Sequence, residues 1–273
     1  MAPIRCLALP GFAQSAQIMM GKLRRMREIF GDEIEIVALD PPNRIPSPTI
    51  SHGVAGLAEV HESVNPVYSW WDWESSRAFK DEFELAIALA HLRDFLERNE
   101  PFDVLLGFSM GASMAVLVLA LMERPYLHPI WNAAPRGSNS SWPPRPFKAA
   151  VLCSAFGPGD PECVAWFEGW APSVPTLHVI GENDVVVSPN YSFDTAARFS
   201  YSKVVWHTGG HHVPRKAYFA HLFKQFYRAR CFPSSDLSGL VVKQEDWGTP
   251  TESVASLDLA VTPLASIMEE PEV

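Results

Sequence analysis

The motif Gly-Phe-Ser-Met-Gly at residues 107–111 separates two apolar runs of different length. The run before it, 102–106, predicts a short buried strand, and the run after it, 112–121, predicts an apolar helix. A chain can pass from strand to helix in so few residues only if the middle residue is strained, and glycines on either side keep side chains clear of the turn. The pattern therefore predicts a sheet with the Ser109 hydroxyl raised above the end of one strand.

The rest of the chain alternates short β-rich runs with longer helical ones, which predicts an α/β fold with a mostly parallel central sheet and helices on both faces. Strands are expected at 4–9, 33–39, 148–153, 176–180 and 203–206, and helices at 16–30, 76–99 and 213–228. Residues 41–73 carry five prolines and fit no regular pattern. A segment rich in proline and tryptophan, 125–146, is expected to form an insertion after the helix that follows Ser109.

The 273 residues fit one α/β domain at 1–231 and an acidic, loosely ordered tail at 232–273. The tail contains eight acidic residues and one lysine, so it holds −7 of the formal net charge of −9. Its periodicity is weak and its serine, threonine and proline content is high, which is typical of loose order. Because no basic surface is indicated, we do not expect the protein to bind nucleic acid.

Cysteine spacing and hydropathy bear on cofactors and on location. The four cysteines are far apart and form no pair with zinc-like spacing. The glycine-rich phosphate-binding motifs are missing as well, so we expect neither a metal ion nor a cofactor. No stretch reaches the roughly 20 apolar residues that span a bilayer, and the apolar run at the N-terminus is too short for a signal peptide. We therefore expect a cytoplasmic protein without a membrane span.

A serine hydroxyl becomes an effective nucleophile only beside a base that is itself oriented by an acid. After a strand–turn–helix of this kind the acid and then the histidine follow in the chain, each on a loop after a strand. The loop after 176–180 offers Glu182 and Asp184. We favour Asp184 as the acid, because a Gly-x-x-Asp turn after an apolar strand is a usual way to present it, and Glu182 is the alternative.

Three histidines follow the strand expected at 203–206, namely His207, His211 and His212. His211 comes directly after two glycines, which let the loop bend toward Ser109. In a locally extended segment the His212 side chain would point the opposite way. His211 is therefore the predicted base, His212 is the alternative, and His207 comes third.

Acyl transfer also needs backbone donors for the negative charge that develops on the carbonyl oxygen of the substrate. The amide of Met110 is one candidate, because it follows Ser109 at the start of the helix. The second donor is expected in the loop after the first strand, where Phe12 follows a Pro-Gly pair. Phe12 and Met110 are thus the predicted oxyanion hole.

Tryptophans gather in two irregular segments. Trp131 and Trp142, in the proline-rich insertion, are candidates for lining an apolar acyl pocket. Trp70, Trp71 and Trp73 precede the helix expected at 76–99, and we expect them to pack beneath a loop.

Together these motifs resemble the FSH family of serine hydrolases, within the α/β-hydrolase superfamily. The resemblance spans 4–228 and rests on LALPGFAQSA at 7–16, WW at 70–71, PFDVLLGFSMGA at 101–112, HVIGENDVVV at 178–187 and GGHHVP at 209–214. It implies a small cytosolic esterase or thioesterase, and it extends to fungal thioesterases that release a polyketide from its synthase. Many members have histidine in place of Pro10 and glutamine in place of Met110, and both departures bear on what the pocket accepts.

The expected activity is hydrolysis of an acyl ester or thioester through an acyl-enzyme on Ser109, with Asp184 and His211 completing the triad. On the resemblance, the substrate is a polyketide or fatty acyl chain presented by an acyl carrier protein of a polyketide synthase. A general short-chain carboxylesterase is the alternative, and a non-catalytic binding protein on the same fold is the rival from another class. A carbon–carbon bond hydrolase or an acyltransferase would use the same three residues.

Overall fold

The computed structural model describes residues 2–45, 66–71, 82–135 and 142–232. Apart from Phe232, the predicted acidic tail lies outside the described residues. The same holds for Trp73 and for positions 76–81 of the helix expected at 76–99.

Within the described residues, six strands form one sheet in which every neighbouring pair is parallel. In spatial order they are β2 (Ile34–Ala38), β1 (Ile4–Leu9), β5 (Val104–Phe108), β6 (Ala149–Cys153), β7 (Thr176–Gly181) and β8 (Ser202–His207). This arrangement confirms the predicted α/β fold. Because all the strands run the same way, the loops that follow them gather at one edge of the sheet.

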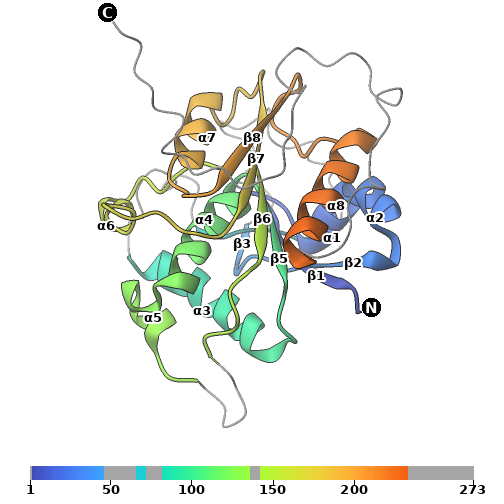
Figure 1. The fold of residues 1–273 in the computed structure, drawn as a ribbon. Helices are drawn as coiled ribbons and strands as arrows, with labels where there is room; N and C mark the ends of the chain where they lie inside the picture. Colours follow the sequence, from blue (N-terminus) through green and yellow to red (C-terminus); the bar gives the residue numbers. More distant parts are fainter. Residues whose placement is uncertain (1, 46–65, 72–81, 136–141, 233–273) are drawn as a thin grey trace, which may run out of the picture.

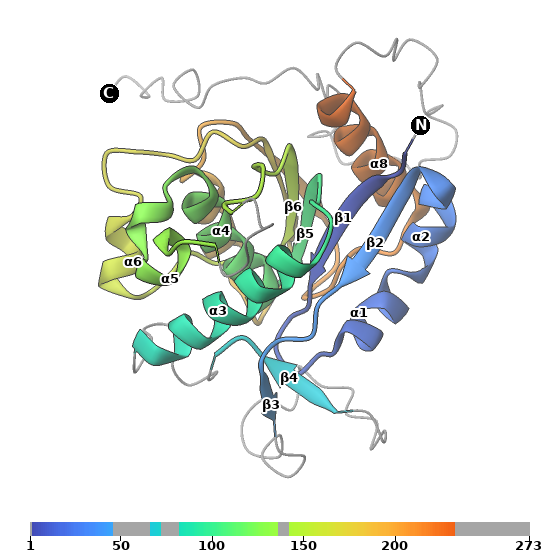
Figure 2. The same ribbon diagram turned by 90° about the horizontal axis from the view of Figure 1, so that it is seen from below.

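Helices cover both faces of this sheet (Figures 1 and 2). On one face lie α1 (Ala16–Lys22), α2 (Arg24–Phe30) and α8 (Ala217–Cys231), and on the other α3 (Glu82–Arg98), α4 (Met110–Glu123), α5 (Pro129–Asn132), α6 (Pro161–Ala165) and α7 (Pro189–Ala196). Single turns of 3₁₀ helix occupy Gly31–Glu33 and Pro125–Leu127. Along β5, Val104 and Leu106 face the core that includes residues of α1, α2 and α8, and Leu105 faces the core that includes residues of α3 and α4. Burial on both faces explains why the central strands read as continuous apolar runs.

The order of the strands reverses between β1 and β5. From β1 the chain moves outward to β2, whereas from β5 it moves the other way to β6, β7 and β8. In open parallel sheets ligands bind at such a switch point, outside the carboxyl ends of the two strands. The loops at this point are the one that follows Leu9 and the turn at Ser109.

The helix expected at 16–30 is interrupted, so that prediction is wrong in one respect. Leu23 leaves the helical conformation, with φ −86° and ψ 4°, and separates α1 from α2. Backbone hydrogen bonding nevertheless continues across the break, since the Leu23 amide donates to Met19 and the Leu23 carbonyl accepts from Arg27. Residue patterns give the apolar period but not a local distortion of this kind.

The sequence patterns did not predict one hairpin and three short helices. β3 (Asn43–Ile45) and β4 (Val67–Ser69) pair antiparallel, in a segment whose prolines argued against strands. Each of α5, α6 and α7 begins at a proline, which suits the first helical position because it has no amide hydrogen to leave unpaired. For α5, which lies in the segment 125–146 expected to be irregular, proline was thus a signal for a helix start.

Two buried histidines lead us to expect a loss of stability in mild acid. Burial lowers the pKa of His178 to about 3, and burial together with the neighbouring His212 lowers the pKa of His207 to about 4. The unfolded chain protonates both below about pH 6.5, whereas the folded protein keeps them neutral, so the unfolded state binds more protons. Stability therefore falls as the pH falls from about 6.5 toward about 4.

From pH 7 to pH 5 we expect the free energy of unfolding to drop by about 2 kcal/mol for each of these histidines. Urea unfolding at the two pH values measures the change. A His178→Leu variant removes one of the two protons and should lose about half of this difference. If the variant and the original protein lose equal stability over the same interval, His178 is not a source of acid sensitivity.

Candidate active site

Ser109 is the single residue between β5 and α4, and its backbone is strained. β5 continues to Phe108 and α4 begins at Met110, so the turn is shorter than the five residues of the motif suggest. The Ser109 backbone has φ 52° and ψ −123°, in the left-handed half of conformational space that a serine rarely occupies. Its amide donates to the Cys153 carbonyl in β6 at 2.9 Å, and its carbonyl accepts from the Ser113 amide at 3.0 Å. Hydrogen bonds from both its amide and its carbonyl therefore hold Ser109 in this strained conformation.

The two flanking glycines are required by close approach of the backbone. A Cβ atom at Gly107 would overlap the backbone of Ala112 in α4. A Cβ atom at Gly111 would overlap the carbonyl oxygens of Leu9 and Pro10, in the loop after β1. The first turn of α4 thus lies directly against that loop.

Asp184 follows β7 and is buried, with 5% of its surface exposed. One carboxylate oxygen accepts from the amides of Val186 at 3.0 Å and Val187 at 2.9 Å, and the other lies 2.8 Å from Nδ1 of His211. Burial acts to raise the pKa of Asp184, but the hydrogen bonds from His211 and Val187 and the nearby Ser154 hydroxyl outweigh it and lower the pKa. The carboxylate is therefore ionised at neutral pH.

His211 joins Asp184 to Ser109. Its Nε2 lies 2.9 Å from Ser109 Oγ, and its ring rests against Phe108 with 5.0 Å between ring centroids. With Asp184 ionised, Nδ1 carries the hydrogen and donates to the carboxylate, so Nε2 is left to accept from the serine hydroxyl. The structure thus brings together the three residues that the sequence singled out as a triad.

The loops after β7 and β8 are packed on one another, which brings His211 to the acid. A Cβ at Gly181 would be 2.6 Å from the Gly210 carbonyl oxygen, so the two loops can touch only where side chains are missing. Asn183 ties them further, because its amide donates to the Gly209 carbonyl at 3.1 Å and its side chain donates to the Thr208 carbonyl at 2.8 Å. The glycines before His211 therefore serve loop packing as well as bending.

The alternative acid and bases lie elsewhere. Glu182 is exposed, and only its amide contributes, by donating to the His207 carbonyl. His212 is exposed and lies on the His207 ring, with 5.0 Å between centroids. His207 accepts the Gly209 amide on Nδ1 at 3.2 Å and packs against Phe219. These contacts stabilise the loop that presents His211.

Ser154 was missed by sequence reasoning. It follows β6 directly, is almost fully buried, and has a left-handed backbone with φ 50°. Its amide donates to the Val179 carbonyl in β7 at 3.0 Å, and its hydroxyl helps to lower the pKa of Asp184. The available signal was its position, since a hydroxyl residue at the carboxyl end of a strand beside β5 falls at the same edge as Ser109.

The predicted oxyanion residues lie on the two segments that meet at the switch point. Met110 is the first residue of α4, where helix amides have no acceptor within the helix. Phe12 lies in the loop after β1, between Gly11 and Ala13, and Ala13 has a left-handed backbone with φ 54°. The Gly11 amide is already used, because it donates to Oε1 of Gln14 at 3.3 Å. Phe12 stays the predicted donor of this loop.

The tryptophans proposed for an acyl pocket pack into the molecule in this structure. Trp131 is fully buried, and Trp142 donates from its indole nitrogen to the Trp131 carbonyl at 2.8 Å. The Arg93 guanidinium of α3 lies 4.5 Å from the centre of the Trp142 ring. A ring without exposed surface cannot touch a substrate in this conformation, so Trp131 packs the insertion against its surroundings. Trp142 is only half-buried, and its place in an acyl pocket stays a prediction.

Two features are absent from the part of the chain that the structure describes. No three His, Cys, Asp or Glu side chains in the described ranges are grouped so that they could hold a metal ion. Among the described helices, none combines the length and the apolar character needed to cross a bilayer.

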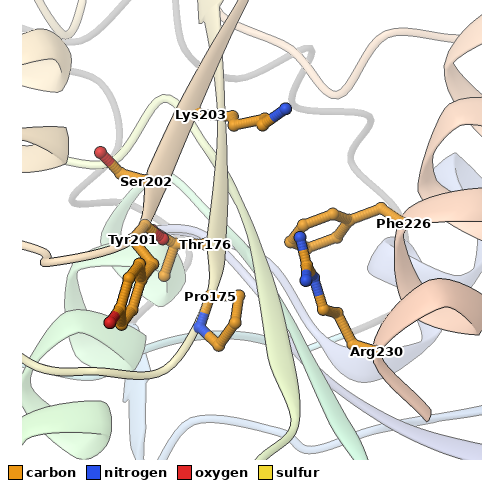
Figure 3. Close-up of a pocket in the computed structure, with 7 residues that line it drawn as sticks. All are labelled: Pro175, Thr176, Tyr201, Ser202, Lys203, Phe226 and Arg230. Carbon is orange, nitrogen blue, oxygen red and sulfur yellow. The ribbon is translucent and has the colours of Figure 1, made fainter. Parts of the chain in front are cut away.

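A small pocket at the opposite edge of the sheet has no relation to Ser109. Thr176 and Ser202, the first residues of β7 and β8, line one side of it, and Phe226 and Arg230 of α8 line the other (Figure 3). Ser109, Asp184 and His211 all follow the carboxyl ends of their strands. The pocket therefore belongs to the edge away from the candidate site.

Two comparisons with known proteins match this chain to hydrolases. The family model described as "Serine hydrolase (FSH1)" matches residues 1–223. Esterase OVCA2 of Danio rerio is 26% identical over 237 residues, which cover 83% of this chain and 97% of the relative.

Solved structures share the fold at low sequence identity. SOBER1 of Arabidopsis thaliana has a TM-score of 0.56 and 14% identity, over 84% of this chain and 100% of its own. Acyl-protein thioesterase 2 of Zea mays has a TM-score of 0.53 and 18% identity, over 82% of this chain and 94% of its own.

Proposed function

We propose that this chain, which belongs to the FSH1 family of serine hydrolases and is a hydrolase acting on esters, cleaves its substrate through a covalent acyl-enzyme on Ser109. The observation that carries the proposal is the pair of hydrogen bonds in series, 2.9 Å from Ser109 to His211 and 2.8 Å from His211 to Asp184. A nucleophile, a base and an orienting acid within hydrogen-bond reach are the arrangement that acyl transfer requires.

In the first half of the reaction, His211 Nε2 takes the proton of the Ser109 hydroxyl as Oγ attacks the carbonyl carbon of the substrate. The bond to the leaving group then breaks, and His211 returns its proton to the departing alcohol or thiol. In the second half, His211 deprotonates a water molecule that attacks the acyl carbon. The carboxylic acid leaves, and Ser109 regains its proton.

Asp184 and the two backbone amides support these steps without exchanging protons. Asp184 keeps the hydrogen of His211 on Nδ1 and stabilises the imidazolium that forms during each attack. The amides of Phe12 and Met110 bind the oxyanion of the tetrahedral intermediate.

The proposal distinguishes a covalent enzyme from a binding protein on the same fold by direct labelling. A fluorophosphonate should modify Ser109 and no other serine, and mass spectrometry of the digested protein locates the adduct. Prior incubation with an ester substrate should slow the labelling. An unlabelled Ser109 in folded protein would favour the non-catalytic alternative.

The finer proposal is that the leaving group is a thiol and that the acyl chain is long or polyketide-like, presented by an acyl carrier protein. It rests on the resemblance to polyketide-releasing thioesterases and on the apolar insertion around Trp142. The name of the Danio rerio relative favours an ester, and a short-chain carboxylesterase is the competing proposal.

A screen of acyl lengths, each as an oxygen ester and as the matched thioester, decides between the two. If kcat/KM rises with chain length and is higher for thioesters, the thioesterase proposal is supported. If short p-nitrophenyl esters give the highest kcat/KM, the carboxylesterase alternative is correct.

A further inference from the structure

We infer that Trp70 is a positioning residue for the oxyanion hole, because its indole N–H fixes the peptide unit that precedes the Phe12 amide. The inference rests on the proposed function, in which that amide binds the oxyanion. Trp70 follows β4, far along the chain from the triad residues, and is fully buried. Its role is therefore set by the fold and not by a local motif.

The contact itself is a hydrogen bond from Trp70 Nε1 to the Pro10 carbonyl oxygen at 2.9 Å. The Pro10 carbonyl and the Gly11 amide belong to one planar peptide unit. At the other end of this unit, the Gly11 amide donates to Gln14 Oε1 at 3.3 Å. Both ends of the Pro10–Gly11 peptide are thus held by side chains, and the next peptide carries the Phe12 amide.

The side chains that hold this peptide are themselves tied to the β3–β4 hairpin. The Tyr68 amide of β4 donates to the Gln14 carbonyl at 3.2 Å, and the two residues form an isolated antiparallel bridge. Asn43 at the start of β3 donates from its side-chain nitrogen to the Trp70 carbonyl at 3.0 Å. The hairpin therefore contacts the loop after β1 through Tyr68, and Asn43 of β3 holds the Trp70 backbone.

On its other side the same peptide touches the turn that carries Ser109. The Pro10 carbonyl oxygen lies so close to Gly111 that a Cβ there would overlap it. A Cβ at Gly11 would come within 3.0 Å of the Phe108 ring. The peptide is thus enclosed between the hairpin and the turn, and its orientation sets the direction of the Phe12 amide relative to Ser109.

Removing the indole N–H would leave the Pro10 carbonyl buried without its donor, so the peptide would rotate toward another partner. The Phe12 amide would then point away from the oxyanion. Loss of one oxyanion donor lowers turnover by about 10²–10³-fold, and an indirect displacement should cost part of that, about 10–100-fold. Substrate binding in the ground state does not use this donor, so KM should change little.

The test compares Trp70→Phe with Trp71→Phe. Trp71 is a second buried indole next in the chain, and its replacement leaves the Trp70–Pro10 bond in place. For Trp70→Phe we expect kcat on a p-nitrophenyl ester to fall by about 10–100-fold while KM stays within about 3-fold. The inhibition constant of phenylboronic acid, which forms a tetrahedral adduct on a catalytic serine, should rise by the same factor as kcat/KM falls. Trp71→Phe should lose much less in both measurements.

A purely structural role for Trp70 predicts something else, namely a lower Tm with kcat and the boronate affinity equal to those of Trp71→Phe. That result overturns the inference. If Trp70→Phe does not fold, Gln14→Met tests the other end of the same peptide, and unchanged kcat and boronate affinity in that variant overturn the inference equally. Ser109→Ala separates this failure from that of the proposed function, because an active Ser109→Ala protein refutes the acyl-enzyme itself.

Discussion

Replacing Ser109 with alanine is expected to lower kcat for ester hydrolysis by about 10⁶-fold, leaving only the rate that binding and the oxyanion donors support. Alanine removes the nucleophile but keeps a Cβ, so the strained backbone at φ 52° is neither relieved nor worsened. The fold and substrate binding should persist. Steady-state hydrolysis of an activated ester, together with Tm, measures both expectations.

Ser113 provides the matched control for this variant. It is a second buried serine, one turn further along α4, and its hydroxyl accepts the Phe156 amide at 3.1 Å. Ser113→Ala should lower Tm slightly and keep kcat within about 10-fold of the original protein. If Ser109→Ala retains most of its activity, or if both variants lose activity alike, Ser109 is not the nucleophile.

The parts of the fold that sequence predicted well are those where local pattern and tertiary environment agree. β5, β6 and β7 are buried on both faces, so their apolar runs carry a strong signal. The turn at Ser109 was visible because close backbone approach demands glycine at 107 and 111. In each case one physical requirement selects a narrow set of residue types.

The parts that could not be predicted depend on contacts between distant residues. The β3–β4 hairpin is short, and its place is set by pairing with Gln14 and by the bond from Trp70 to Pro10. No residue near Trp70 in the sequence indicates that its indole reaches the loop after β1. The burial of Trp131 could not be predicted for a related reason, because an apolar side chain in an insertion gives the same sequence signal whether it lines a pocket or fills a core.

At the candidate site, chain order and strand ends were enough to find the residues that the structure brings together. Parallel strands place every following loop at one edge, so Ser109, Asp184 and His211 meet although they are far apart in sequence. Ser154 carries the same positional signal, because it follows β6 directly, but nothing in its sequence neighbours distinguishes it as a site residue.

The two adjacent histidines allow a sharp comparison, and we expect His211→Gln to be about 10⁶-fold slower than the original protein while His212→Gln keeps most of its activity. His211 is the residue whose nitrogens contact both Ser109 Oγ and Asp184. Glutamine cannot take up a proton near neutral pH, so the serine hydroxyl would lack a base. His212 is exposed and contacts the His207 ring, so its loss should affect the loop and not the proton transfer.

Comparison of kcat for the two variants, with fluorophosphonate labelling rates as a second measurement, decides which histidine is the base.

The double variant Ser109→Ala/His211→Gln adds an independent criterion. Residues that act as one unit lose their effect together, so the double variant should be no slower than Ser109→Ala alone. A further loss of several orders of magnitude in the double variant would mean that His211 acts separately from Ser109. A large loss in His212→Gln, with His211→Gln nearly unaffected, would move the base to His212 and would require the loop after β8 to rearrange before reaction.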